Sequence, residues 1–336
     1  MPRRLHLGYA LLFFIASAAG QTQPCEVDVP LNIVMPDAAL VRNVPQDGFA
    51  AHRGSDVLAI RSVSADTASR RIVLVVENGK NVNLAARKVE ASMLGAIVRN
   101  ARTEDSFAFL TTSGPRKELP FGASRDMLLS SIAELSSPAK GKDQDKSTLD
   151  ALFEASGWLQ PPQPGDSIIF LTMGLKPGQA EYGKVGRALT SAGIRLFGFQ
   201  LGRLYVGTYG LSFAPSPSGV LLPRATIDPN QETMFDLADE TGGFFLGENT
   251  EGGPQRTYHL TDERLQLLDK FGRQLYKGIV EYYRIRLIGG PEGFAIDLTD
   301  SVRQKLLKAH MLYPRKMPHC SLASPANPSS PGPSVR

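Results

Sequence analysis

Four short runs of aliphatic and β-branched residues alternate with longer helical segments in the middle of this chain. The runs are 71–76, 106–112, 166–172 and 194–201. Runs of this length that are apolar at almost every position are typical of strands buried on both faces. Strands that alternate with helices form parallel sheets covered by those helices. The sequence therefore predicts an α/β fold with a Rossmann-like, doubly wound and mostly parallel sheet.

The segments between the runs carry apolar residues at helical spacing. Val82, Ala86, Val89, Met93 and Ile97 show this most clearly, because they fall on one helical face. The predicted helices are 82–99, 124–135, 148–159, 179–192, 232–241 and 265–280. The apolar residues of 203–230 do not recur at helical or strand spacing, which predicts a long insertion. Residues 244–246 predict a short edge strand.

Different patterns flank this central part. Residues 21–70 are interrupted by prolines and predict an arm that ends in an edge strand, and residues 281–288 and 294–298 predict a two-stranded addition. Residues 321–336 are rich in Pro and Ser, which predicts a disordered tail. The predicted division is a signal segment (1–20), an arm (21–70), the α/β domain (71–250), a small C-terminal α+β extension (251–320) and the tail (321–336).

The first 20 residues have the layout of a secretory signal peptide. Arg3 and Arg4 precede an apolar run at 9–15, and small residues follow at 16–20. The apolar run is shorter than the about 20 residues of a membrane-spanning helix. We expect cleavage near Gly20 and an exported protein, periplasmic or extracellular, with no transmembrane segment after cleavage.

The two cysteines, Cys25 and Cys320, lie near the two ends of the mature chain. Disulfides persist in exported proteins, and the termini of a domain are often close together. A single disulfide between Cys25 and Cys320 is one prediction; two unpaired thiols are the alternative.

The charge balance argues against a nucleic-acid partner. The formal net charge is +4, but Arg3 and Arg4 belong to the signal segment, and no stripe of basic residues follows. A nearly balanced chain does not offer the broad positive surface that phosphate binding requires.

Enzyme motifs are incomplete or missing. None of His52, His259, His310 and His319 is paired at the i,i+4 spacing of a zinc helix. No Gly-x-Ser-x-Gly elbow occurs, and the phosphate-loop-like segment 178–185 ends in Val185, where magnesium needs a hydroxyl. The sequence predicts a protein that is not an enzyme; an envelope hydrolase without a recognisable motif stays an alternative.

Several segments together resemble the von Willebrand factor A (VWA) domain. In that family a buried strand is followed by Asp-x-Ser-x-Ser, a Thr lies on a separate loop, and an Asp follows a later strand. The matching segments here are Glu77-Asn78-Gly79-Lys80-Asn81, Lys146-Ser147-Thr148, Leu171-Thr172-Met173-Gly174 and Leu237-Ala238-Asp239-Glu240-Thr241-Gly242-Gly243. Further segments resemble the C-terminal extension of exported VWA-related proteins of acidobacteria: Arg273-Gln274-Leu275-Tyr276, Glu281-Tyr282-Tyr283 and Pro314-Arg315-Lys316. The resemblance covers about residues 55 to 317.

The resemblance implies a metal-ion-dependent adhesion site, but this sequence departs from its ligand pattern. Glu77 replaces an Asp and is longer by one methylene, Gly79 has no side-chain oxygen, and Met173 offers a soft thioether. Mg²⁺ takes hard oxygen ligands in a strict octahedral geometry. Asn81 is also a preferred helix N-cap. We expect a degenerate site with no cofactor; the alternative is Mg²⁺ or Ca²⁺ held by Glu77, Asn81 and Thr148.

The place of these residues still suggests a binding surface. In open parallel sheets, ligands bind at the carboxyl ends of the strands, near the point where the strand order reverses. We call the residues predicted there the strand-end rim: Glu77, Asn78, Gly79, Asn81, Thr148 and Met173. The sequence predicts an exported VWA-like module that binds a protein or another envelope component through this rim. A Mg²⁺- or Ca²⁺-dependent adhesion domain is the first alternative.

Overall fold

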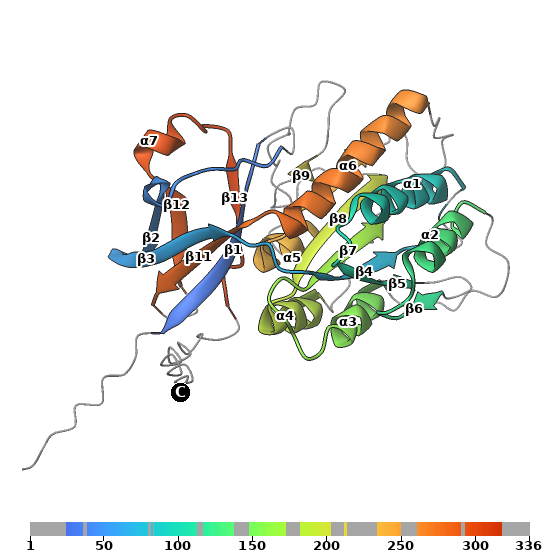
Figure 1. Ribbon diagram of the computed structural model, residues 1–336, viewed down its shortest axis with the longest axis horizontal. Helices are drawn as coiled ribbons and strands as arrows, with labels where there is room; N and C mark the ends of the chain where they lie inside the picture. The colour runs from blue at the N-terminus through green and yellow to red at the C-terminus, as the bar shows by residue number, and fades with distance from the viewer. Residues whose placement is uncertain are drawn as a thin grey trace, which may run out of the picture.

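The computed structural model describes most of the chain between residues 25 and 317. The described residues are 25–35, 39–79, 82, 84–112, 117–137, 148–172, 182–202, 212–213, 234–249, 261–289 and 293–317. Their strands form two sheets, which lie side by side (Figure 1).

The larger sheet has seven strands and is parallel except at one edge. Its order is β6-β5-β4-β7-β8-β10-β9, and only β6 runs antiparallel to its neighbour. The strands are β4 (Arg71–Val76), β5 (Ser106–Thr111), β6 (Glu118–Leu119), β7 (Ser167–Thr172), β8 (Arg195–Gly202), β9 (Ser212–Phe213) and β10 (Phe245–Asn249). All six residues of β7 are buried. The predicted α/β fold with a mostly parallel sheet is therefore confirmed.

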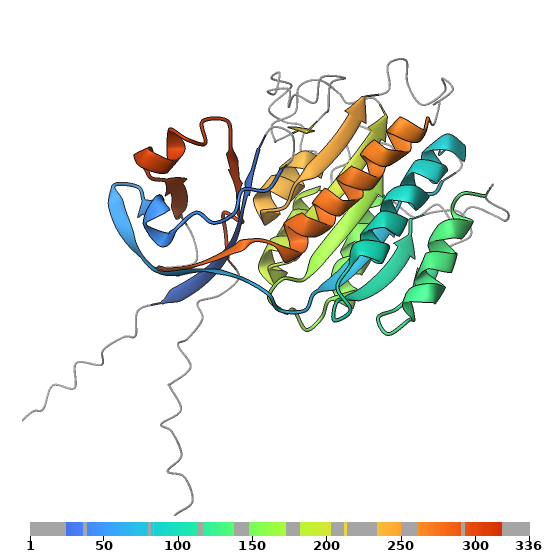
Figure 2. The same ribbon diagram turned by 45° about the horizontal axis from the view of Figure 1, so that its top comes forward.

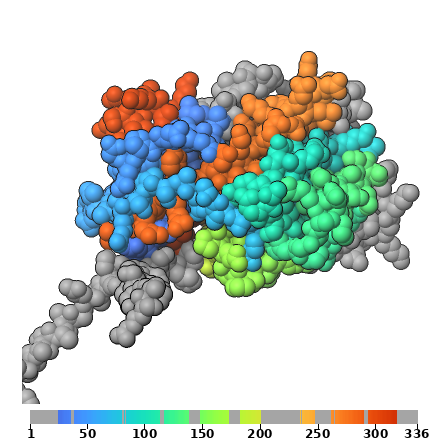
Figure 3. All heavy atoms as spheres, in the orientation of Figure 1, coloured from blue at the N-terminus to red at the C-terminus, as the bar shows by residue number. Residues whose placement is uncertain are grey.

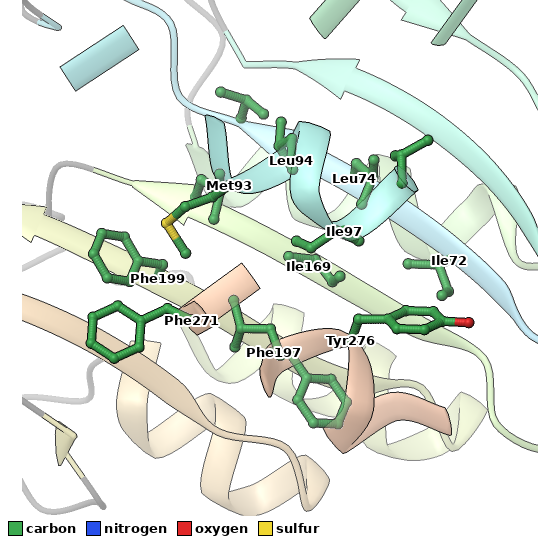
Figure 4. Close-up of a cluster of buried hydrophobic side chains, with 14 of the residues drawn as sticks. Ile72, Leu74, Met93, Leu94, Ile97, Ile169, Phe197, Phe199, Phe271 and Tyr276 are labelled. Carbon is green, nitrogen blue, oxygen red and sulfur yellow. The ribbon is translucent and has the colours of Figure 1, made fainter. Parts of the chain in front are cut away.

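Helices cover both faces of this sheet (Figure 2). One face packs against α1 (Leu84–Asn100), α2 (Arg125–Glu134) and α6 (Asp262–Val280). The other face packs against α3 (Thr148–Trp158), α4 (Tyr182–Ala192) and α5 (Met234–Thr241). Figure 4 shows the first layer, in which Met93 and Ile97 of α1 and Phe271 of α6 meet Ile169 and Phe199 of the sheet. Gly272 lets α1 and α6 approach closely, because a Cβ there would lie 2.8 Å from the Met93 carbonyl oxygen.

The second sheet is antiparallel and combines both ends of the described chain. Its order is β12-β2-β3-β11-β1-β13. The strands are β1 (Glu26–Val34), β2 (Phe49–Arg53), β3 (Asp56–Ala65), β11 (Tyr283–Ile288), β12 (Ala295–Leu298) and β13 (His310–Leu312), with the short helices η1 (Gln46–Gly48) and α7 (Asp300–Arg303) beside them. The sheet curls into a nearly closed barrel: Ile296 N donates to Tyr313 Oη at 2.9 Å, and the Phe294 and Tyr313 rings stack.

This sheet differs from the predicted arm and two-stranded addition. β11 and β12 do not pair with each other; β11 lies between β1 and β3, and β12 pairs with β2. The N-terminal and C-terminal segments therefore form one side of the molecule together (Figure 3). The prediction of a two-stranded addition is wrong, because strand pairing across more than 200 residues leaves no local pattern.

Two smaller expectations about the parallel sheet also change. Residues 244–246 were predicted to form an edge strand, but β10 has β9 on its outer side, and β9 comes from within the predicted insertion. The two-residue strand β6 closes the opposite edge and has no counterpart in the predictions. Strands of two residues are too short to carry a sequence period.

The predicted signal segment, the tail and Cys320 lie outside the described residues. Cys25 precedes β1, and its carbonyl oxygen accepts from Gly289 N at 2.8 Å. Its pairing with Cys320 stays a prediction. Among the described residues, no helix combines the length and the apolar character that crossing a membrane requires.

Candidate functional site

The strand-end rim lies at the reversal point of the parallel sheet. The chain goes from β4 to β5 on one side and later returns to β7 on the other side of β4. Glu77, Asn78 and Gly79 directly follow β4 in one turn, and Thr148 is the first residue of α3, which packs against β4 and β7. Asn81 and Met173 lie outside the described residues. The four described rim residues thus occupy the loops where open α/β sheets bind their ligands.

A hydrogen bond joins the ends of the two central strands. Thr172 Oγ1, at the end of β7, donates to Glu77 Oε2 at 2.5 Å, and Glu77 N donates to the Leu171 carbonyl oxygen at 3.0 Å. Hydrogen bonds to a carboxylate are short and strong. The Glu77 carboxylate is therefore held over β7 rather than pointing freely into solvent.

A buried arginine holds the turn that follows Glu77. Arg87 is 5% exposed, and its Nη2 donates to the Asn78 and Gly79 carbonyl oxygens at 2.8 and 3.0 Å. Its Nε donates to the Val82 carbonyl oxygen at 3.1 Å. One side chain thus satisfies three carbonyl oxygens of a turn without regular structure, which fixes the backbone shape of this part of the rim.

A second buried charged residue, Glu90, lies on α1 one turn further along. It is 2% exposed, and neither carboxylate oxygen has a hydrogen-bond partner among the described residues. Burial, followed by the negative charge of Glu77, raises the pKa of Glu90 well above its usual value, and the charge of Arg87 opposes this shift. The surroundings of Glu90 therefore favour its neutral form.

Sequence reasoning found Glu77 and its turn but missed Thr172, Arg87 and Glu90. A signal for Glu90 was present, since it lies four residues after Ala86 and three before Met93, on the apolar face of the predicted helix. A charged residue on such a face is unusual and marks a buried polar group. For Thr172 the signal was its position at the end of a predicted strand.

The side chains available as metal ligands at the rim do not fit the hard divalent cation that the VWA pattern implies. Glu77 Oε2 already accepts the Thr172 hydroxyl proton, Gly79 has no side chain, and a thioether stands at Met173. Within the described ranges, no group of three or more His, Cys, Asp or Glu side chains is arranged to hold a metal ion.

Comparisons with known proteins show a likeness in structure rather than in sequence. No protein-family profile matches the chain. No curated protein matches it either. Solved structures do match: a von Willebrand factor type A protein from Catenulispora acidiphila is 11% identical, with 80% of this chain and 67% of that chain covered and a TM-score of 0.43.

Two further matches have similar values. An aerotolerance-related membrane protein from Bacteroides fragilis is 13% identical, with 62% of this chain and 99% of that chain covered and a TM-score of 0.41. The proximal thread matrix protein 1 of the mussel byssus, with a zinc-occupied MIDAS motif, is 12% identical, with 67% of this chain and 50% of that chain covered and a TM-score of 0.42. The chain is thus structurally similar to VWA domain proteins at low sequence identity.

Proposed function

We propose that this protein is an exported, non-enzymatic binding module of VWA-like fold that binds a protein or another envelope component through the strand-end rim. The observation that carries the proposal is a set of polar groups held in place at the reversal point of the sheet, where Glu77 and Gly79 are partly exposed. Glu77 is anchored by Thr172, and Arg87 fixes the carbonyl groups of the adjoining turn. A surface whose polar groups are already oriented loses little conformational entropy when a partner binds.

The rim supports direct recognition better than recognition through a metal ion. In VWA adhesion sites a cation bridges the domain and its ligand, whereas the donor set here lacks hard oxygen ligands at Gly79 and Met173. Glu77 instead places a carboxylate, oriented by Thr172, at this edge of the sheet. Hydrogen bonding to a partner needs no cation in this arrangement.

Affinity capture from envelope extract tests the rim. The baits are the mature wild-type chain and its variants Glu77→Gln and Met173→Asp. Glu104→Gln is the matched control, because Glu104 is half exposed and precedes β5 at the opposite end of the sheet. We expect a partner that wild type and Glu104→Gln recover equally and that both rim variants recover at least about fivefold less, because Glu77→Gln removes the charge from a hydrogen-bonding group and Met173→Asp replaces an apolar side chain with a charged one. Equal recovery by all four baits would exclude the rim as the binding surface.

Two further measurements separate the alternatives. Calorimetric titration of Mg²⁺, Ca²⁺ and Mn²⁺ into the mature chain is expected to give no binding heat, and binding that Glu77→Ala abolishes would favour a metal-dependent adhesion domain. Assays with generic ester, peptide and phosphate substrates are expected to show no turnover. Turnover that persists through purification and is lost on substitution of rim residues would favour a hydrolase.

A further inference from the structure

A cavity of about 300 Å³ lies between the two sheets, at the amino ends of the parallel strands. Its walls come from the loops before β7 and β8 and from β1, β11 and the segments beside them. The cavity is thus at the opposite end of the parallel strands from the strand-end rim. Its volume is at the lower end of the range for small-molecule sites in proteins.

The two carboxylates of the cavity are already engaged by the protein. Asp66 Oδ1 accepts from Ala68 N at 2.9 Å, and Asp66 Oδ2 accepts from the Tyr282 hydroxyl at 3.0 Å. Asp28 accepts two hydrogen bonds from Arg286, at 2.7 and 2.9 Å. Neither carboxylate has much capacity left for a cationic ligand.

The guanidinium groups, by contrast, include one that no carboxylate neutralises among the described residues. Arg195 is fully buried, and within the described residues its guanidinium donates hydrogen bonds to the Gly242 and Gly278 carbonyl oxygens and to Asn32 Oδ1, all of them uncharged. Arg70 lies behind Gly165 of the cavity wall, on the ring of Tyr282.

The hydrogen-bonding capacity of Arg70 is unused. Its Nη2 is 2.9 Å from Asp66 Oδ1, but no nitrogen of its guanidinium has an aligned hydrogen-bond acceptor among the described residues. Arg70 is thus neutralised by Asp66, whereas Arg195 has no carboxylate partner among the described residues, and a buried guanidinium of that kind attracts an anion strongly. The end of α4 at Ala192 adds an opposing partial charge of only about half a unit, so the cationic groups dominate.

Arg284 is the guanidinium that a ligand can reach. It lines the cavity, its side chain is 41% exposed, and it lies 3.3 Å from Asp28 and 3.6 Å from Asp66. These distances exceed the about 2.7–2.9 Å of strong charge-assisted hydrogen bonds. Arg284 therefore keeps donor groups for an incoming anion.

The remaining walls are apolar and rigid. They are formed by Pro30, Pro162, Pro164, Ala192 and Met317. Prolines present flat, pre-ordered surfaces, and Met adapts its shape to a neighbour. A ligand with a flat apolar body fits such walls, with its charged end toward Arg284.

We propose that this cavity binds a small organic carboxylate, whose carboxylate group is received by Arg284 in the positive field of Arg195 and Arg70. Its compact apolar body lies against the proline and methionine walls. The site is independent of the strand-end rim and of what the rim binds.

Titration of the mature chain with benzoate, followed by calorimetry and ligand-observed NMR, tests this site. Benzamide and benzamidine are the matched probes, since they share the ring but are neutral and cationic. We expect benzoate to bind at least about tenfold more tightly than either, and Arg284→Gln to weaken benzoate about tenfold, as loss of one charge-assisted hydrogen bond predicts. Arg303→Gln is the control, because Arg303 is 53% exposed on α7 and does not line the cavity.

A second variant distinguishes loss of the binding site from loss of the fold. Ala192→Phe fills part of the cavity from the end of α4 without removing any charge, and it is expected to reduce benzoate binding while circular dichroism stays unchanged. Absence of benzoate binding to wild type, equal affinity for benzamide, or full binding by folded Arg284→Gln would each overturn the proposal. Partner capture through the rim is expected to be the same for Arg284→Gln as for wild type, so the two proposals fail separately.

Discussion

The two ends of the same parallel strands differ in the ionisable groups that lie there. At the carboxyl ends, burial and then the negative charge of Glu77 raise the pKa of Glu90, and Arg87 opposes this shift. At the amino ends, Arg70 and Arg195 are two fully buried guanidinium groups, each about 4.9 Å from the centre of the Tyr282 ring. Burial lowers the pKa of Arg195 to about 10.

The difference lies in what the buried groups connect. Arg195, on the parallel sheet, binds Asn32 of β1 and the Gly242 and Gly278 carbonyl groups, so it links the antiparallel sheet to the loop after α5 and to α6. The acids at the carboxyl ends link only neighbouring segments of one sheet layer. We infer that the amino ends hold the two sheets together, whereas the described polar contacts at the carboxyl ends stay within the parallel sheet and its helices.

Replacing Arg195 with Met tests most directly whether the amino ends hold the two sheets together. The change leaves three buried oxygen acceptors, on Asn32, Gly242 and Gly278, without their donor. Each unsatisfied buried group costs about 1–3 kcal/mol, so we expect a loss of about 3–5 kcal/mol in the free energy of unfolding, measured with urea. Arg303→Met, at an exposed position, is expected to change it by less than about 0.5 kcal/mol. A similar small loss for both variants would show that Arg195 does not link the sheets.

Adding a methyl group at Gly165 tests how tightly the amino-end cluster is packed. Gly165 has φ +88°, and a Cβ there would lie 2.6 Å from Nη1 of the buried Arg70. Gly122 has φ +96° and open space around its Cβ position. We expect Gly122→Ala to cost about 1 kcal/mol from backbone strain alone, and Gly165→Ala about 2–3 kcal/mol because overpacking is added. Equal losses in urea unfolding would mean that Arg70 can move aside.

The pH dependence of Glu90→Gln tests the carboxyl-end acids. Below pH 4.5 Glu90 is protonated in both states, but at higher pH the unfolded chain ionises while the folded chain keeps the proton, because the folded pKa is raised. Wild type therefore loses stability relative to the variant as pH rises above 4.5. We expect the free energy of unfolding of Glu90→Gln, relative to wild type, to be higher at pH 8 than at pH 4. If the difference in free energy of unfolding between variant and wild type did not change with pH, the pKa of Glu90 would not be raised in the folded protein.

The parallel sheet was predictable because its signals are local. The run 71–76 coincides with β4, and the predicted helix at 148–159 differs from α3 by one residue, since strands buried on both faces and amphipathic helices repeat within a few residues. The position of Glu77 followed from the same reasoning, because the polar residue after a buried strand lies at the edge of the sheet. Its contact with Thr172 required the neighbouring strand to be known.

The sequence by itself determined the α/β sheet, the helices on it and the presence of Glu77, Asn78 and Gly79 at a strand end. Only the tertiary structure decided that β1 pairs with β11, so that Glu26 faces Ile288, and that Arg70, Arg195 and Tyr282 meet between the two sheets. The physical reason is the range of the interactions. Backbone propensity and side-chain periodicity act over a few residues, whereas strand register and buried charge depend on segments that only folding brings together.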